Sequence, residues 1–243
     1  MTPPGKRALV TGGSGGIGAA ICKRLSAAGH HVYINANRGI AAAESLAAEI
    51  TAAGGSAAAV QFDVTDAAAT HAALDRILET GPIQVLVNNA GIHDDAVFPG
   101  MNPGQWQRVI DVSLQGFYNV TQPLTMPMIR TRWGRIVNIS SISGLIGNRG
   151  QVNYAAAKGA VNAATKALSL EVASRGITVN AVAPGIIATE MGNAAFDAAA
   201  IDNLVPMKRA GKPQEVAELV AFLASEHAAY ITGQVISING GII

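Results

Sequence analysis

The sequence predicts an α/β protein with a doubly wound parallel sheet, and three observations lead to that prediction. Short apolar segments alternate with helical segments along the 243 residues, which is the pattern of successive βαβ units. A glycine-rich turn directly follows the first apolar segment. No linker, repeat or change of composition divides the chain. We therefore expect residues 1–243 to form a single Rossmann-like domain with about seven parallel strands flanked by helices.

The first predicted strand, residues 7–10, leads into the glycine-rich turn and then into a helix that includes residues 19–25. Strand, turn and helix in this order are the context that a dinucleotide-binding fingerprint requires. Gly12, Gly16 and Gly18 permit a tight turn and let a pyrophosphate approach the backbone at the helix N-terminus. The alternative is a glycine loop needed only for packing.

The second predicted strand, residues 31–35, ends without a carboxylate. Proteins that prefer NAD place an acidic residue about 20 residues after the glycines, where it binds the ribose 2′-hydroxyl. This chain has Ala36, Asn37 and Arg38 there instead. A guanidinium can bind a 2′-phosphate, so we expect NADPH/NADP+. The alternative is that Arg38 is only a solvated loop residue.

The later segments complete the predicted alternation. Further strands are expected at residues 57–62, 83–87, 135–139, 177–183 and 234–238, and helices at residues 40–53, 67–80, 105–131, 154–174 and 213–224. Asp66 is expected to cap the N-terminus of its helix. Pro123 and Pro127 are expected to kink or break the helix that contains them. Residues 186–210 are expected to form a mobile substrate lid.

Polar side chains follow the third and fourth predicted strands. Asp63 could accept a hydrogen bond from an adenine amine. Asn88 and Asn89 could tie neighbouring strand ends together or line the cofactor. Because the carboxyl ends of parallel strands share one edge of a sheet, these residues are candidates for the binding crevice.

Tyr154 and Lys158 are four residues apart in a predicted helix and therefore share one face. A free phenol has a pKa of about 10, and a nearby positive charge is expected to lower that pKa. The tyrosine would then be a usable general acid or base. On spacing alone, such a pair is more often an ordinary surface pair.

Composition excludes several classes of protein. The net charge is +1 and 14% of residues are charged, so no electrostatic footprint for nucleic acid is present. The five histidines lack metal-ligand spacing, and Cys22 is expected to be a buried thiol. The apolar run near the N-terminus is too short for a signal peptide, and no apolar stretch of about 18 residues follows. We expect a soluble cytoplasmic protein without a bound metal.

Several motifs occur together over nearly the whole chain, and their combination resembles the short-chain dehydrogenase/reductase family. They are Thr11-Gly12, Gly16 and Gly18, Asn88-Asn89-Ala90-Gly91, Ser141, Tyr154 with Lys158, and Pro184-Gly185. Within that family, residues 147–154, 175–180 and 233–241 are similar to the 3-oxoacyl-[acyl-carrier-protein] reductases.

The resemblance implies catalytic roles for three residues. Tyr154 would donate a proton to the substrate carbonyl oxygen as NADPH delivers hydride to the carbon. Lys158 would lower the pKa of the phenol and hold the nicotinamide ribose. Ser141 would hydrogen-bond the same carbonyl oxygen, although spacing alone does not exclude its neighbours Ser140 and Ser143.

The resemblance also implies a set of cofactor contacts. Ile187 would contact the nicotinamide end through its backbone, and Thr189 would contact it through its hydroxyl. The full expected set is Gly12, Ser14, Gly16, Ile17, Gly18, Asn37, Arg38, Asp63, Val64, Asn89, Ala90, Gly91, Tyr154, Lys158, Pro184, Gly185, Ile187 and Thr189.

One position departs from the family pattern. The family has an asparagine as its fourth catalytic residue, and this chain has Ser113 there. In the family, the backbone carbonyl of that residue holds a water that relays protons to the lysine. A serine keeps the carbonyl, so we expect slower or pH-shifted turnover rather than an inactive protein.

The resemblance also implies partners. The substrate would be carried by an acidic acyl carrier protein, with Arg132 and Arg175 at the family's docking positions near the active-site rim. The alternative for either residue is an ordinary solvated arginine. The chain would form a homotetramer through its two long helices and its C-terminal strand, for which the apolar Ile242-Ile243 is suited.

The acyl substrate stays open between fatty-acid intermediates and polyene or polyketide intermediates, the latter because of residues 120–124 and 126–129. Two alternatives also stay open. The chain could reduce or oxidise another ketone or alcohol, or it could be a non-catalytic NADP(H)-binding subunit of a hetero-oligomer.

Overall fold

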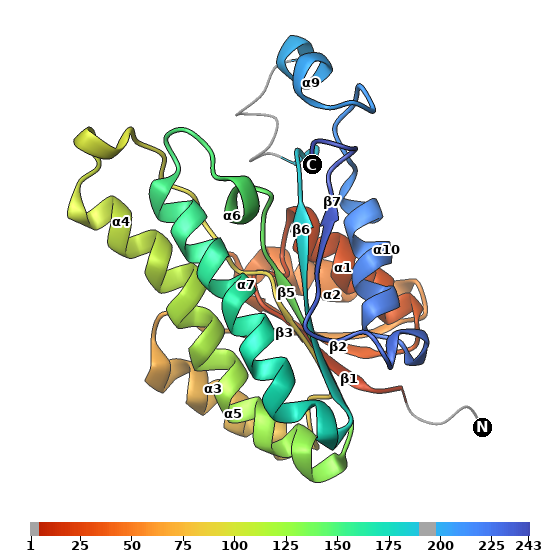
Figure 1. The fold of residues 1–243 in the computed structure, drawn as a ribbon. Coiled ribbons are helices and arrows are strands. Elements are labelled where there is room, and N and C mark those ends of the chain that lie inside the picture. The colour runs from red at the N-terminus through yellow and green to blue at the C-terminus, as the bar shows by residue number, and fades with distance from the viewer. Residues whose placement is uncertain (1–4, 190–197) are drawn as a thin grey trace.

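A parallel sheet of seven strands runs through the molecule. The computed structural model describes residues 5–189 and 198–243, and in them the strands have the order β3-β2-β1-β4-β5-β6-β7 (Figure 1). The strands are β1 (Arg7–Val10), β2 (His31–Ala36), β3 (Ser56–Gln61), β4 (Val85–Asn88), β5 (Gly134–Ile139), β6 (Ile177–Pro184) and β7 (Val235–Ile238). Every neighbouring pair is parallel. The predicted fold class is confirmed.

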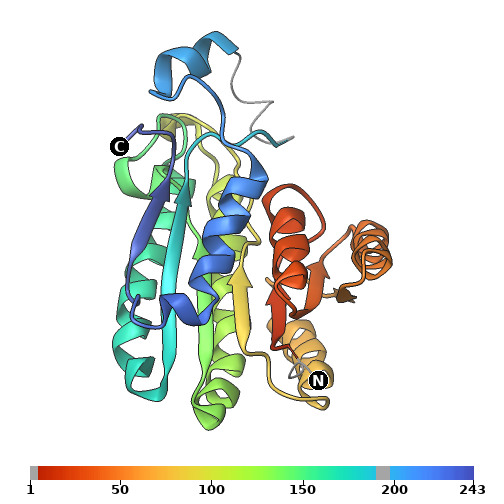
Figure 2. The same cartoon turned by 90° about the vertical axis from the view of Figure 1, so that its right-hand side faces the viewer.

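Helices cover both faces of the sheet (Figures 1 and 2). One face carries α1 (Gly16–Ala27), α2 (Ile40–Ala52) and α10 (Pro213–Leu223). The other carries α3 (Ala67–Leu78), α4 (Pro103–Ile110), α5 (Gly116–Thr131) and α7 (Val152–Val172). Two short helices, α6 (Ser143–Ile146) and α9 (Ala198–Leu204), lie at the carboxyl edge of the sheet.

The strand side chains alternate between two hydrophobic cores, because successive residues of a strand point to opposite faces. Ala8 and Val10 of β1 lie in the core beneath α1, α2 and α10. Leu9 lies in the other core, with α3, α5 and α7. All three residues are fully buried. Burial on both faces explains why the strand segments read as continuous apolar runs.

The chain changes direction across the sheet between β1 and β4. It proceeds from β1 to β2 and β3 on one side, and then from β4 through β7 on the other. In a doubly wound sheet, ligands bind in the crevice outside the carboxyl ends of the strands at this switch point. The predicted site residues therefore belong mainly to the loops after β1 and β4 and their neighbours.

Of the kink or break expected at Pro123 and Pro127, the break does not occur. Both prolines lie inside the continuous helix α5. Leu124 and Met128, which follow them, are fully buried, so packing holds the helix together despite the missing N–H groups. The irregular turn lies earlier, in the π-helical segment η2 (Asp111–Gln115) between α4 and α5.

The other helix predictions agree with the structure to within a few residues. Asp66 caps α3, since its carboxylate accepts a hydrogen bond of 2.9 Å from Ala69 N. Of the expected lid, the structure describes residues 186–189 and 198–210, whereas residues 190–197 lie outside the described residues. Within the described ranges, no helix has the length and apolar character needed to cross a bilayer.

Candidate active site

Tyr154 and Lys158 lie on one face of α7, as their spacing predicts. Lys158 Nζ is 5.6 Å from the centroid of the Tyr154 ring. The ammonium group is almost fully buried, with 4% of Lys158 exposed, and it donates a 2.8 Å hydrogen bond to the carbonyl oxygen of Ile139 at the end of β5. Tyr154 is partly exposed, so its ring can meet a ligand from the solvent side.

The structure distinguishes Ser141 from the two neighbouring serines. Ser141 forms a hydrogen bond with Tyr154 through its side chain. Ser140 is buried and its hydroxyl lies 3.4 Å from the carbonyl oxygen of Lys158. The hydroxyl of Ser143 donates to Gln151 Oε1 at 2.9 Å. Ser141 is therefore the serine that can share a carbonyl oxygen with the phenol.

The predicted direction of the Tyr154 pKa shift is wrong. Burial raises the pKa of the phenol above its ordinary value, and this effect outweighs the hydrogen bond from Ser141, which acts in the lowering direction. The negative charge of Asp95 adds to the rise. Lys158, whose ammonium group donates to the Ile139 carbonyl oxygen, does not reverse this rise. Tyr154 is thus held in its protonated form, the form that acts as an acid.

Burial also acts on Lys158, where it lowers the pKa from 10.5 to about 8. Loss of solvent disfavours the charged form of an amine, so the pKa falls. Near neutral pH the side chain is still mostly protonated, and it loses its charge as the pH rises through about 8.

The glycine-rich turn is built for close approach. Gly12 has a φ of +59°, and a Cβ on Gly18 would lie 2.3 Å from the carbonyl oxygen of Gly12, so a side chain cannot fit there. Asn89 Nδ2 holds the turn from β4 by donating to the carbonyl oxygens of Thr11 and Gly12 at 3.0 and 2.9 Å. Asn35 Oδ1 accepts from Gly12 N at 3.2 Å.

The turn leaves the N-terminus of α1 accessible to a phosphate group. No side chain caps this helix. A Cβ on Gly15 would have no heavy atom within 4 Å, and one on Gly16 would meet Thr189 at 3.5 Å. Open space beside free helix N–H groups fits a pyrophosphate, so the residues present fit a dinucleotide.

The expected adenosine end of the site is a connected group of polar side chains. Asn37 Nδ2 donates to Asp63 Oδ2 at 2.7 Å, and Asp63 Oδ1 accepts from the backbone and hydroxyl of Thr65 at 2.9 and 2.8 Å. Arg38 is exposed beside them and its charge contributes to lowering the Asp63 pKa. The Ser14 hydroxyl lies near Gly39, within 3.7 Å of a Cβ built there, so the glycine turn and the end of β2 face each other.

The expected nicotinamide end is formed where β6 leaves the sheet. Ile142 N donates to the Pro184 carbonyl oxygen at 3.0 Å, which joins this segment to the Ser141 loop. Ile187 pairs with Gly211 in an isolated parallel bridge. The remaining expected cofactor residues lie at the same edge of the sheet, in α1 or directly after β3, β4 and β6: Ile17, Val64, Ala90, Gly91 and Gly185.

Asn88 and Asn89 tie strand ends together, as one of the two predicted roles requires. Asn88 Nδ2 donates to Asn138 Oδ1 at 2.8 Å and to Thr121 Oγ1 at 2.9 Å, which links β4 to β5 and α5. Asn88 Oδ1 is buried without a hydrogen-bond partner.

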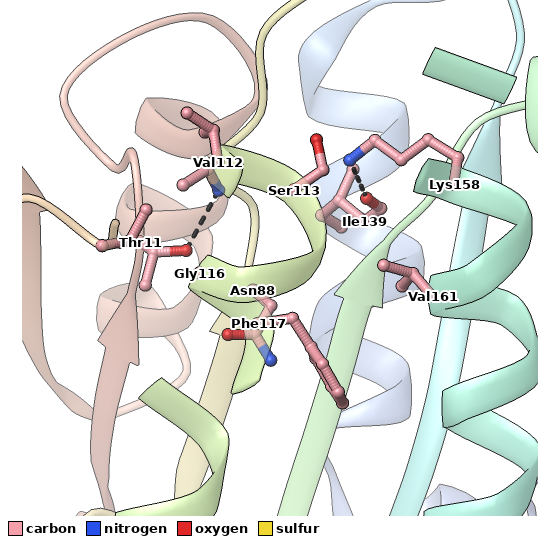
Figure 3. A pocket seen from close by; sticks show the side chains of 11 residues that line it. Thr11, Asn88, Val112, Ser113, Gly116, Phe117, Ile139, Lys158 and Val161 are labelled. Atoms are coloured by element: carbon pink, nitrogen blue, oxygen red, sulfur yellow. Dashed lines mark hydrogen bonds between the residues drawn. The ribbon is translucent and has the colours of Figure 1, made fainter. Parts of the chain in front are cut away.

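Ser113 lies in the π-helical segment beside Lys158 (Figure 3). Its hydroxyl is buried and has no hydrogen-bond partner. Ser113, Asn88 and Lys158 all line a cavity of about 10 Å³, which is about the volume that one water molecule requires. Two buried acceptors and an ammonium group at this cavity are suitable partners for a water.

Arg132 and Arg175 lie away from this site. Arg132 follows α5 and Arg175 ends the segment η3 (Ala173–Arg175) after α7, so both precede the starts of β5 and β6. Arg132 Nη2 donates to the carbonyl oxygen of Ser174, which places the two segments together. They occupy the edge of the sheet opposite Ser141 and Tyr154 (Figure 1). The expectation that they border the active site of their own chain is therefore wrong.

Sequence reasoning missed residues that hold the site together. Thr11 Oγ1 accepts from the backbone N–H groups of Asn89 and Ala90, both at 3.0 Å, and Asn35 supports Gly12. Both are polar residues at the carboxyl end of an apolar strand, and that position could have marked them. Over the described ranges, no group of three or more His, Cys, Asp or Glu residues could hold a metal ion.

The fold and the site together indicate a dinucleotide-dependent oxidoreductase: a glycine turn at the switch point that fits a pyrophosphate, and a phenol with a serine and a lysine beside it. Residues 6–200 match the family model described as short chain dehydrogenase. The chain belongs to the short-chain dehydrogenase family.

Two proteins of similar sequence and one solved structure match nearly the whole chain. The chain is 46% identical over 236 residues to a 3-oxoacyl-[acyl-carrier-protein] reductase FabG of Aggregatibacter actinomycetemcomitans, covering 96% of this chain and 98% of the relative. It is 46% identical over 238 residues to an acetoacetyl-CoA reductase of Rhizobium meliloti, covering 96% and 97%. A crystal structure described as a candidate gluconate dehydrogenase of Agrobacterium tumefaciens superposes with a TM-score of 0.94 at 35% identity, covering 98% and 96%.

Proposed function

We propose that this protein reduces a 3-oxoacyl thioester to the 3-hydroxyacyl thioester with NADPH, as one catalytic domain. The observation that carries the proposal is the convergence of Ser141, Tyr154 and Lys158 at the edge where the dinucleotide turn lies. Two relatives of high identity are named for 3-oxoacyl substrates, one attached to a carrier protein and one to coenzyme A.

Each of the three proposed catalytic residues has a separate role in the reduction. The nucleotide, when bound, supplies hydride to the carbonyl carbon. Tyr154 donates its phenolic proton to the carbonyl oxygen, so one hydride and one proton together convert the ketone to the alcohol. Ser141 donates a hydrogen bond to the same oxygen and thereby stabilises the charge that develops there. Lys158 supplies a positive charge beside the phenolate that remains.

The nucleotide would be held by residues from five loops. The glycine turn with Ser14 and Ile17 would take the pyrophosphate, and Asn37, Arg38, Asp63 and Val64 would take the adenosine half. Asn89, Ala90, Gly91 and Lys158 would line the ribose side, and Pro184, Gly185, Ile187 and Thr189 the nicotinamide side.

The preference for NADPH rests on Arg38. Arg38→Ala should raise the KM for NADPH by about 10- to 100-fold, because a hydrogen bond to a charged group contributes about 1.5–3 kcal/mol, and should leave the KM for NADH nearly unchanged. Steady-state kinetics with both cofactors checks this. Arg76→Ala, at an exposed position of α3, is the control. Equal losses with both cofactors would contradict the 2′-phosphate contact.

The role of Ser113 is tested by restoring the family residue. Ser113→Asn places a larger polar side chain at the cavity that Ser113 and Lys158 line. We expect faster turnover, or a shift of the alkaline limb of the pH–rate profile, because a water in this cavity would relay protons to Lys158 under the proposed mechanism. The measurement is kcat as a function of pH. An unchanged profile would remove any special role for Ser113.

The proposed carrier-protein contact depends on Arg132 and Arg175. Because they lie at the far edge of their own chain, they would border an active site only across an assembly of two copies. The double substitution Arg132→Glu with Arg175→Glu should weaken turnover of carrier-bound substrate, chiefly through the association rate, and spare a short thioester analogue. Equal losses on both substrates would contradict carrier docking.

We propose a homotetramer located in the cytoplasm. Large apolar side chains are exposed on the helices and strand expected to meet in it: Tyr118, Met126 and Leu170 on α5 and α7, and Phe222, Tyr230 and Ile243 around β7. Burial of such groups between copies would be favourable. The acyl substrate would come from fatty-acid synthesis or from polyene or polyketide synthesis.

A second candidate function has support from the structural relative described as a candidate gluconate dehydrogenase. The same serine, tyrosine and lysine could then oxidise or reduce a sugar alcohol or another small ketone. A panel of 3-oxoacyl thioesters, sugar acids and simple ketones, assayed with NADPH or NADP+, separates the two candidates by kcat/KM.

A further inference from the structure

A series of hydrogen bonds joins the loop after β4 to the serine of the active site. Gln151 Nε2 donates to Asp95 Oδ2 at 2.9 Å. Ser143 Oγ donates to Gln151 Oε1 at 2.9 Å, and Ser143 N donates to Ser141 Oγ at 3.1 Å. Asp95 is thus connected to Ser141 through two intervening residues, the side chain of Gln151 and then Ser143, which reaches Ser141 with its backbone N–H.

The backbone fixes this loop against the start of α7. Ala96 N donates to the carbonyl oxygen of Gly150 at 2.9 Å. Asn153 Nδ2 donates to the carbonyl oxygen of Asp94 at 3.0 Å, while Asn153 Oδ1 accepts from Tyr154 N at 2.8 Å. Asn153 is fully buried. The backbone on either side of Asp95 is therefore held against the start of α7, next to Tyr154.

The other charged groups near Tyr154, those of Asp94 and Lys158, already have hydrogen-bond partners. Asp94 accepts hydrogen bonds from Arg108 and Gln105 of α4, and these bonds lower its pKa. Lys158 of α7 is directed to the Ile139 carbonyl oxygen.

Asp95 carries the negative charge that acts on the phenol. His93 Nδ1 lies 3.1 Å from Asp95 Oδ1, and both side chains are partly exposed. After burial and the hydrogen bond from Ser141, the charge of Asp95 is the third influence on Tyr154, and it raises the pKa of the phenol.

We propose that Asp95 is a positioning residue for the reduction, an inference that rests on the proposed function. Through Gln151 and Ser143 it fixes the orientation of Ser141. Its charge acts on Tyr154 in the direction that keeps the phenol protonated, and the protonated phenol is the form that can donate a proton to the carbonyl oxygen.

The first test follows Tyr154 directly and needs no substrate. The near-ultraviolet absorbance of tyrosinate is followed as a function of pH in the wild type and in Asp95→Asn. For each protein, the titration of the same protein carrying Tyr154→Phe is subtracted, which leaves the signal of Tyr154 alone. Removal of a negative charge lowers the pKa of a nearby phenol, so Asp95→Asn should shift the Tyr154 titration to lower pH. Asp94→Asn removes the same charge one residue away and should leave the titration in place. Equal shifts in both variants, or none in Asp95→Asn, would overturn the proposal.

The second test uses catalysis. In Asp95→Asn, the alkaline limb of the pH–rate profile for reduction should move to lower pH. Asp95→Glu keeps the negative charge, so its alkaline limb should stay at the wild-type pH. If the limb of Asp95→Glu moved as far as that of Asp95→Asn, the proposed role of the charge would be overturned. Gln151→Leu interrupts the hydrogen bonds and should lower kcat, and an unchanged kcat would overturn the positioning role.

The two tests also separate this inference from the proposed function. A wild type that reduces no 3-oxoacyl thioester would refute the proposed function. A shifted Tyr154 titration in Asp95→Asn would still support the effect of Asp95 on the phenol. The Asp95 side chain is 43% exposed, so its isosteric replacement leaves the packing intact.

Discussion

Tyr154→Phe should lower kcat for reduction by about 10²- to 10⁴-fold, the usual contribution of a positioned general acid. The substitution removes one oxygen and leaves the ring in place on α7. Because the phenol is the proposed proton donor, the loss should appear in kcat, whereas the affinity for NADPH should stay near that of the wild type. Stopped-flow measurement of NADPH oxidation with a 3-oxoacyl thioester checks the rate, and quenching of NADPH fluorescence checks binding.

Tyr118→Phe is the matched control, since Tyr118 is a tyrosine on α5 with 57% of its surface exposed. It should retain wild-type kcat. If Tyr154→Phe kept kcat within about tenfold of the wild type, well below the general-acid contribution, another group would have to supply the proton.

Lys158→Met should have two opposite effects: loss of turnover and gain of stability. The pKa of Lys158 falls from 10.5 to about 8 on folding, which corresponds to a cost of about 3 kcal/mol for keeping the charged form buried. Loss of the hydrogen bond to the Ile139 carbonyl oxygen destabilises the variant by about 1 kcal/mol, which offsets part of this gain. The variant should therefore be more stable than the wild type by about 2 kcal/mol below pH 8.

The difference in stability between the wild type and Lys158→Met should depend on pH. Between pH 8 and 10.5 the unfolded lysine binds a proton that the folded one has released, so the free energy of unfolding of the wild type rises with pH in that window. Lys158→Met lacks this rise, and the two stabilities should converge as the pH increases. Urea denaturation at several pH values measures both. Lys166→Met, at an exposed position on the same helix, should change neither quantity, and a wild-type-like slope in Lys158→Met would assign the titration to another group.

The sequence predicted the sheet well because parallel buried strands have a simple signature. The central strands, such as β5, are buried on both faces, so each of them reads as an apolar run between turn residues. The glycine turn was equally readable, because Gly18 stands where a Cβ would collide with the Gly12 carbonyl oxygen. The convergence of Ser141, Tyr154 and Lys158 also agreed with the spacing and the family resemblance.

Three features could not be read from the sequence because tertiary context decides them. The low helix propensity of proline predicted a kink or break at Pro123, whereas buried packing keeps α5 continuous. The irregular turn lies at Ser113 instead. The Tyr154 pKa depends on burial, which spacing does not report. The hydrogen bond from Gln151 to Asp95 joins residues that are 56 positions apart along the chain, and no local sequence pattern predicts it.

The all-parallel pairing of the sheet has a consequence for how the protein reaches its native state. Parallel neighbours cannot be joined by a tight hairpin, so each pairing, such as β1 with β4, closes a long stretch of chain. Folds dominated by such non-local pairings form slowly. The glycine turn and Asn89 come from the two strands of that pairing, so nucleotide affinity should emerge during refolding only after the centre of the sheet has assembled. Recovery of NADPH binding is therefore a kinetic marker of a late folding step, well after the helices have formed.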